Sequence, residues 1–215
     1  MQRYYFRQCT ATFLDRTFGL RQTFESQILD RWLHAEIALS NREKDILENY
    51  QELLLINRDS WNEQELALHF IGPILGLVRF TEPYRFNLFA ERRIGAVIST
   101  DAGDIELSGE PDGMIATGFR EPEIPFFAFT EYKRQLDPNG DPVGQTLAAM
   151  LVARTLNEEQ HPIYGAYVVG SDWRFMVLNG NHYTISRDYS AISDEIFVIL
   201  RTLKELKQIV MELTA

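Results

Sequence analysis

Charged residues stand directly beside the most apolar part of this sequence. Asp112 precedes the segment "GMIATG", and Glu131 and Lys133 follow "FFAF", which has the composition of a buried strand. Charge next to a buried strand is normally paired or holds a metal ion, because an isolated buried charge is costly. These residues are therefore candidates for a functional site, and the alternative is that they are solvated charges at strand ends.

Glu131 and Lys133 are separated by one residue, which places both on the same face of a strand. Tyr132 points to the opposite face, while Phe127 and Phe129 continue the face of Glu131 toward the interior. The two charges are therefore expected at the rim of a buried surface, where little water reaches them.

Asp112 lies in the strand before Glu131, and hairpin pairing can bring the two carboxylates together. Carboxylates that converge where there is little water repel each other, and a hard divalent cation with oxygen ligands relieves that repulsion. A lysine on the same face can orient or deprotonate a metal-bound water and can offset charge that develops on a phosphate. The arrangement of Asp112, Glu131 and Lys133 thus predicts a site that hydrolyses phosphodiester bonds.

The bare patterns Pro-Asp and acid-x-Lys are weak signals, because a chain of this length contains each of them about once or twice by chance. Glu205, Leu206 and Lys207 also fit the second pattern, but they lie in a helical segment with charged neighbours and are interpreted as solvated surface. The context of a buried strand is what distinguishes Glu131 and Lys133.

The composition favours one folded domain, or a core with an extension, in 215 residues. The single Cys9 excludes an internal disulfide framework and a thiolate zinc cluster, and the four histidines lack the spacing of a zinc hydrolase. No long apolar run and no secretory signal are found, so a cytoplasmic protein without a membrane segment is expected. The net charge of −10 counts against nucleic-acid binding, although a local basic strip can sit on an acidic molecule.

Residues 1–60 are predicted to form a helical extension that packs on the rest of the chain or dimerises. Apolar residues recur at helical spacing in "FESQILDRWLHAEIAL" and "NREKDILENYQELLLI", with Ser40 or Asn41 as the cap of the second helix. A further helix follows in "SWNEQELALHFIGPILGLVRF", capped by Asn62 and bent or shortened by Pro73.

From Tyr84 onward the apolar spacing changes to that of strands. Three strands with short connections, in "RFNLFAERRIGAVIST", "IELSGEPDGMIATG" and "FFAFTEYKRQ", predict an antiparallel meander. The break "DPNGDP" follows, and Asp141 and Pro142 open a helix. The remainder predicts a strand buried on both faces, "IYGAYVVG", then a hairpin with Asn179 and Gly180 at its turn, and an amphipathic closing helix.

The motifs "GEPDGMIATG" and "FTEYKRQ", within this order of elements, resemble the PD-(D/E)XK nuclease superfamily, which has the restriction-endonuclease-like fold. The resemblance implies an α/β (α+β) core in residues 61–215, with a mixed central sheet of αβββαβ order flanked by helices. The chain is similar to a bacterial family with this core, and "WNEQELALHFIGPIL" is similar to the first-helix motif of nuclease domains in the type I restriction family.

The resemblance implies a site for Mg²⁺ or Mn²⁺. Asp112, Glu131 and the main-chain carbonyl of Tyr132 would ligate the ion, and Lys133 would act on the attacking water. Glu65, on the first helix, would hold an outer water or a second ion, whereas the residues alone favour a solvent-facing acid at that position.

Gln145 also has a counterpart in this resemblance. "GQTLAAML" resembles the glutamine-bearing helix of recombination exonucleases, which implies that Gln145 positions a phosphate. Those relatives usually carry Tyr four residues later, where this sequence has Ala149, and this departure leaves the role of Gln145 open.

The implied function is a divalent-metal-dependent nuclease that acts on nucleic acid, with DNA as the first expectation. A duplex has two strands to cut, so a homodimer is one arrangement that the resemblance allows. The alternatives are a nucleic-acid-binding or complex-forming module that keeps the fold but cuts weakly or not at all, and a purely structural partner. Four arginines are candidates for contact with the nucleic-acid backbone, and each also has an ordinary surface interpretation: Arg92, Arg93, Arg134 and Arg154.

Overall fold

The apolar segment after Pro162 forms the central strand of a mixed sheet, β8 (Ile163–Val169), which is buried along most of its length. The computed structural model describes residues 1–136 and 138–215, so position 137 of the "DPNGDP" break lies outside the described residues. The strands of this main sheet are, from edge to edge, β2 (Arg21–Thr23), β10 (His182–Ile185), β9 (Asp172–Asn179), β8, β7 (Glu123–Lys133), β6 (Gly113–Thr117) and β3 (Asn87–Ala90), with β11 (Tyr189–Ser190) beside β9. β7 runs parallel to β8 and β9 runs antiparallel to it, so the sheet is mixed as predicted.

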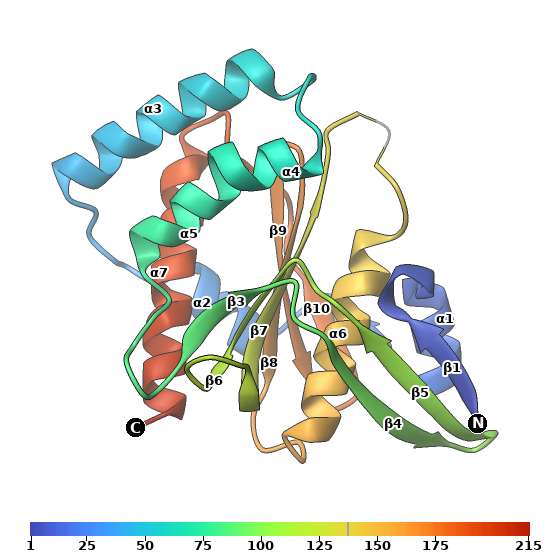
Figure 1. Cartoon of the computed structure of the whole chain (residues 1–215). Coiled ribbons are helices and arrows are strands. Elements are labelled where there is room, and N and C mark those ends of the chain that lie inside the picture. Colours follow the sequence, from blue (N-terminus) through green and yellow to red (C-terminus); the bar gives the residue numbers. More distant parts are fainter. Residues whose placement is uncertain (137) are drawn as a thin grey trace.

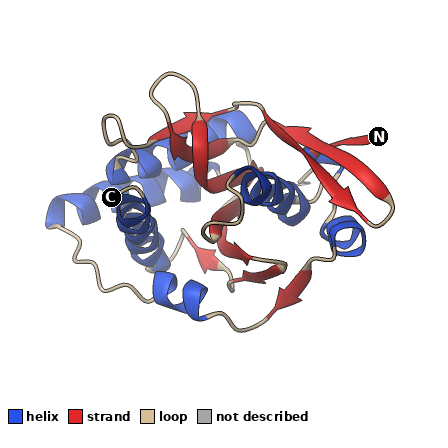
Figure 2. Cartoon of the chain, turned by 90° about the horizontal axis from the view of Figure 1, so that it is seen from below, coloured by secondary structure: helices blue, strands red, loops and turns tan. Residues whose placement is uncertain are grey.

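Helices cover both faces of the main sheet (Figure 1), and seen from below the strands lie between them (Figure 2). One face carries α2 (Gln27–Leu33), α4 (Glu63–Leu66), α5 (Gly72–Val78) and α7 (Glu195–Leu213), with α3 (Asn41–Asn57) packed against α7. The other face carries α6 (Pro142–Leu156), α1 (Ala11–Phe18) and a small second sheet of β1 (Gln2–Tyr5), β5 (Gly103–Gly109) and β4 (Ile94–Thr100). Within the described residues, no helix is both long enough and apolar enough to cross a membrane.

The strands that precede β7 form one long ribbon that bends in its middle. β3 pairs with β6, while β4, which follows β3, pairs with β5, which precedes β6. The bend comprises residues 91–93 on one side and 110–112 on the other. Pro111 has no N–H to donate to a ladder, and Glu91 adopts a left-handed φ of 51°, so pairing stops there. The expected meander of three strands is therefore built from five.

The N-terminal sixty residues are not helical throughout, contrary to the prediction. β1 pairs in parallel with β5, and β2 pairs in parallel with β10, so this segment adds one edge strand to each sheet. Both strands are too short for an alternating pattern to stand out in the sequence. Leu14, Leu20 and Leu47 are buried in the same clusters as the side chains of residues 61–215. The N-terminal segment therefore shares the hydrophobic core.

The predicted starts of three helices are confirmed. Ser40 caps α3 and forms a capping box with Glu43. Asn62 caps α4, and the side chain of Asp141 caps α6 by accepting a hydrogen bond from the Gly144 N–H. Each cap satisfies main-chain N–H groups that have no partner within the helix.

Two local details differ from the prediction. The helix that begins at Asn62 passes through a π-helical turn, η2 (Ala67–Ile71), before it continues as α5, and this adjusts the chain to Pro73, which has no N–H to donate. The hairpin turn between β9 and β10 lies one residue later than predicted, at residues 180–181, because Asn179 still pairs with His182.

Gly144 is the point where the N-terminal segment touches α6. A Cβ at this position would meet the main-chain oxygen of Cys9 at 2.3 Å and the Cα of Thr10 at 2.6 Å. We expect Gly144→Ala to lower the free energy of unfolding by about 1–3 kcal/mol, because overpacking forces the backbone to shift. Urea unfolding measures this change. Gly76→Ala on α5, where a Cβ meets nothing within 4 Å, is the matched control and should be neutral or slightly stabilising.

Candidate active site

The bend in the ribbon brings Asp112 to the end of β7. The register pairs Gly113 with Thr130, so Asp112 stands opposite Glu131. Asp112 Oδ2 accepts a hydrogen bond of 2.6 Å from the main-chain N–H of Tyr132. Asp112 is thus half-buried and held against the neighbouring strand, and the structure brings the two carboxylates together.

Glu131, Lys133 and Gln145 form a buried polar group beside it. Lys133 Nζ donates to Glu131 Oε1 at 2.7 Å, and Gln145 Nε2 donates to the same oxygen from α6. Glu131 and Lys133 are each 6% exposed, so they are not solvated charges at a strand end. Together with Asp112 these residues are called the acid–lysine cluster below.

The side chains of β7 alternate between faces, with one exception. Tyr132 points away from Glu131 and packs in the core on the α4–α7 side, as predicted. Phe129 lies on the face of Glu131, but Phe127 lies on the face of Tyr132, contrary to the prediction. The pairing of β6 with β7 shifts its register just after Ile115, and such a bulge changes the face on which side chains emerge.

Burial and mutual repulsion raise the pKa values of both carboxyl groups. Burial, and then the charge of Asp112, raises the pKa of Glu131 to about 7. Burial also raises the pKa of Asp112, although the hydrogen bond from Tyr132 acts in the opposite direction. Burial by itself lowers the pKa of Lys133, but the hydrogen bond and charge of Glu131, with the nearby acids, outweigh it and raise that pKa. Lys133 is therefore an ammonium ion, which orients and donates hydrogen bonds.

Glu65 does not reach the acid–lysine cluster. Its carboxylate accepts a hydrogen bond of 2.9 Å from the Asn62 N–H in a capping box, and the side chain is exposed. Glu63 takes the position toward the site, with Oε1 3.9 Å from Lys133 Nζ. Residues two apart on a helix point in nearly opposite directions, so an acid on the right helix can still face away from the site.

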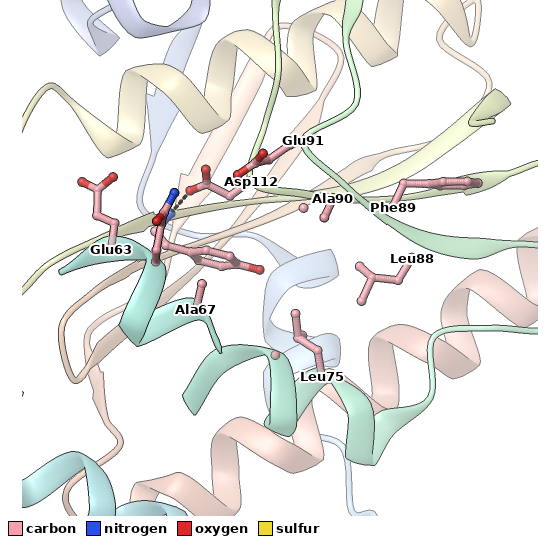
Figure 3. A pocket seen from close by; sticks show the side chains of 12 residues that line it. Glu63, Ala67, Leu75, Leu88, Phe89, Ala90, Glu91 and Asp112 are labelled. Atoms are coloured by element: carbon pink, nitrogen blue, oxygen red, sulfur yellow. Dashed lines mark hydrogen bonds between the residues drawn. The ribbon is translucent and has the colours of Figure 1, made fainter. Parts of the chain in front are cut away.

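Hollows open on two sides of the acid–lysine cluster. Asp112 lines a pocket of about 340 Å³ between α4–α5 and the β3–β6 half of the ribbon (Figure 3), called the α5 pocket below. Glu131 and Gln145 line a second hollow of about 270 Å³ together with Arg7 and Arg93, called the arginine hollow. The charged groups are largely buried, yet the cluster borders a hollow on each side.

The four candidate arginines have different surroundings. Arg93 lines the arginine hollow, and Arg134 lines a depression that also contains Glu63. Arg92 forms a surface ion pair of 3.2 Å with Glu121.

Arg154 is buried, so its position fits neither a backbone contact nor the ordinary surface arginine that was the alternative. It is 8% exposed, and its guanidinium donates to the main-chain oxygen of Gly180 and to Asn181 at 2.6 Å. Its role is to hold the β9–β10 turn against α6, because a buried cation persists only when it is hydrogen-bonded.

Two residues near the site were not identified from the sequence. Arg7 reaches the arginine hollow only because β1 pairs with β5, and no local pattern predicts that parallel contact between distant segments. Glu63 lies in the same helical motif as Glu65, and the cap at Asn62 was the available signal, since the third residue after a cap commonly turns back to it.

The two carboxylates suit a divalent cation. Among the described residues, nothing is hydrogen-bonded to Asp112 Oδ1 or Glu131 Oε2, so each acid has an oxygen to offer. A cation between them would relieve the repulsion that raises the pKa of Glu131. No group of three or more His, Cys, Asp and Glu residues that could hold a metal occurs in residues 1–136 and 138–215. Mg²⁺ is compatible with two acids, because it is commonly held by one or two carboxylates together with waters and phosphate oxygens.

No protein-family model matches the sequence, and no curated protein matches it. The structure defines the protein as a mixed α/β protein with a large mixed sheet flanked by helices. A buried acid–lysine cluster lies where β6 begins and β7 ends. The restriction-endonuclease-like identity of this core stays a prediction.

Proposed function

We propose that the protein is a divalent-metal-dependent nuclease with a restriction-endonuclease-like core. It hydrolyses phosphodiester bonds, and DNA is the first expected substrate. One observation carries the proposal: Asp112, from the bend before β6, meets Glu131 and Lys133 of β7 at a largely buried point that borders hollows on both sides. Charged groups at such a point stabilise a fold less well than apolar residues would, and strongly shifted pKa values gather at functional sites. The order and spacing of these residues agree with the resemblance seen in the sequence.

In this proposal, Asp112 and Glu131 hold the cation, with the main-chain carbonyl of Tyr132 as the third ligand that the resemblance implies. A bound divalent cation supplies a Lewis acid that withdraws charge from the phosphate. Lys133 donates a hydrogen bond toward the oxygen that gains charge during cleavage. Gln145 fixes Oε1 of Glu131, so it is a positioning residue for the carboxylate rather than a direct contact to phosphate.

The phosphate backbone would approach through the arginine hollow. Arg7 and Arg93 lie there beside Glu131, while the net charge of −10 opposes binding elsewhere on the surface. Affinity for nucleic acid should therefore fall steeply with salt, as it does wherever a few cations carry the contact. The proposal includes a cytoplasmic location.

Calorimetric titration with Mg²⁺ and Mn²⁺ tests the proposal, with cleavage of single- and double-stranded DNA and RNA assayed beside it. We expect one of these ions to bind and DNA to be cut only in its presence. Sedimentation with and without duplex DNA separates a monomer from a homodimer. A protein that binds neither ion would contradict the proposal.

The second candidate function is a nucleic-acid-binding or complex-forming module that keeps the fold without cutting. One observation favours it: Lys133 and Gln145 both donate hydrogen bonds to Glu131 Oε1, so this carboxylate has partners in the protein without an ion. Ala149 is fully buried under the sheet, so no polar group from that position reaches the site. Binding of nucleic acid that is independent of metal and leads to no cleavage would support this alternative.

Glu63→Ala and Glu65→Ala are expected to have different effects, although the two acids are on the same short helix. Glu63 is near Lys133, and its negative charge acts on the cluster, since it raises the pKa of Asp112. The same negative charge attracts a cation. Its loss should therefore weaken Mg²⁺ binding and cleavage about tenfold, as for other supporting residues at metal sites. Loss of Glu65 removes part of a helix cap and should cost at most about 1 kcal/mol of stability. Metal titration and urea unfolding of both variants check this. If Glu65→Ala weakened metal binding and Glu63→Ala did not, Glu65 would be the acid that supports the metal site.

A further inference from the structure

The α5 pocket has no role in the mechanism proposed above. It lies next to Asp112, and its volume of about 340 Å³ falls within the range of small-molecule sites. Figure 3 shows Asp112 and Glu91 together at one side of the pocket, with Ala67 and Leu75 of the helices opposite. Any strand whose phosphate reached Asp112 would have part of its nucleotide at the mouth of this pocket.

Small residues keep the α5 pocket open, because larger ones on facing elements would pack and fill it. Leu75, Leu88 and Tyr132 give it an apolar lining. A Cβ on Gly113 would meet Thr130 Oγ1 at 2.4 Å, so a larger residue does not fit at this position of the lining. The lining residues with a methyl group or no side chain are Ala67, Gly72, Ala90 and Gly113.

The polar side chains of the α5 pocket are three acids, Glu63, Glu91 and Asp112, with the amide of Gln64 and the hydroxyl of Tyr132, which accepts a hydrogen bond of 2.9 Å from Thr130 Oγ1. No Arg or Lys is among the described residues that line it. Carboxylates repel a phosphate, and the arginine hollow on the other side of the cluster attracts one. The two hollows therefore suit different parts of a nucleotide, and the α5 pocket suits a flat apolar group that carries N–H donors.

We propose that the α5 pocket receives one unpaired base of a nucleic-acid strand whose phosphate lies at Asp112 and Glu131. This inference rests on the proposed nuclease function and specifies its substrate. A nucleobase is a flat ring, and the exocyclic amino groups of adenine, cytosine and guanine can donate to carboxylates, as that of cytosine does to Glu and Asp. A base in a duplex is paired and stacked and must be flipped out at a cost. Single strands and frayed ends are therefore the preferred substrates, and adenine, cytosine or guanine is preferred over thymine in the pocket.

Single-stranded DNA oligonucleotides with one abasic site, moved along the strand, test this inference. Binding is read by fluorescence anisotropy in Mg²⁺ with the Lys133→Met protein, and cleavage of the same strands is measured with the wild type. We expect one position at which the abasic site weakens binding about tenfold, equal to about 1.4 kcal/mol. Thymine at that position should bind more weakly than cytosine or adenine. Equal binding at every position would overturn the inference.

Ala90→Trp fills the α5 pocket from its exposed end. Ala90 is exposed and lies on the same face of β3 as Leu88, so the indole enters the pocket without displacing the core. We expect single-strand binding to fall about tenfold and the base preference to disappear, with Mg²⁺ affinity and Tm unchanged. Ile209→Trp, in a hollow between α2 and α7, is the control for an added indole and should leave single-strand binding, base preference and Mg²⁺ affinity unchanged. If the Ala90→Trp protein bound single strands as tightly as the wild type does, the α5 pocket would not be the site of the base.

Failure of the base pocket and failure of the proposed function give different results. Metal-dependent cleavage that ignores both the abasic site and Ala90→Trp keeps the nuclease and overturns the pocket. Binding that depends on one base, without metal-dependent cleavage of any strand by the wild type, supports the pocket and overturns the nuclease.

Discussion

Lys133→Met is expected to slow metal-dependent cleavage about a thousandfold. Nζ of Lys133 is the only cationic group hydrogen-bonded to Glu131 among the described residues, and its pKa is raised, so it keeps its charge at neutral pH. Methionine has nearly the same length and no charge. In the Lys133→Met protein, the substrate oxygen that gains negative charge in the transition state therefore has no ammonium group to donate a hydrogen bond to it. Single-turnover cleavage of labelled DNA measures the loss.

Lys207→Met is the matched control for this experiment. Lys207 belongs to the second acid-x-Lys triplet of the chain, and from α7 it forms a half-buried ion pair of 3.0 Å with Glu82. Its loss should leave cleavage unchanged and lower the free energy of unfolding by about 1 kcal/mol. Circular dichroism and Mg²⁺ titration of the Lys133→Met protein establish that the fold and the metal site persist. Cleavage at the wild-type rate in that protein would end the catalytic interpretation of Lys133.

Without a metal ion, the protein is expected to become less stable as the pH rises from about 5 to about 8. The folded state raises the pKa of Glu131 from 4.5 to about 7, so between these values the folded chain binds a proton that the unfolded chain has lost. The free energy of unfolding therefore falls across this interval, by on the order of 3 kcal/mol at most. Asp112 contributes in the same direction, because burial raises its pKa too.

Urea unfolding in EDTA at several pH values measures this slope. Excess Mg²⁺ should reverse it, because the ion binds the deprotonated carboxylates and stabilises the fold most at high pH. Glu131→Gln should flatten the slope in EDTA. Glu43→Gln is the control, because Lys204 and the Ser40 cap lower the pKa of Glu43 to about 2. The contribution of Glu43 to the free energy of unfolding is therefore lost only below pH 4.5. A slope that survives Glu131→Gln unchanged would place the titrating group elsewhere.

Local patterns determined most of the elements of the fold. Caps at Ser40, Asn62 and Asp141, the unbroken apolar run of β8 and the stripe of α7 each depend on neighbours within a few residues, and they appear in the structure where they were predicted. The spacing of Glu131 and Lys133 belongs to the same class, because residues two apart share a face wherever the strand is regular, whereas the bulge at Phe127 shows where this rule ends.

Contacts between distant segments were decided only by the tertiary structure. The parallel pairing of β1 with β5 delivers Arg7 to the site, and the bend in the ribbon lets Asp112 touch the Tyr132 N–H. The choice of Glu63 over Glu65 follows from which side of a single helical turn faces β7. These outcomes depend on how whole elements pack, and packing energy is shared among many residues, so no short stretch of sequence carries the signal.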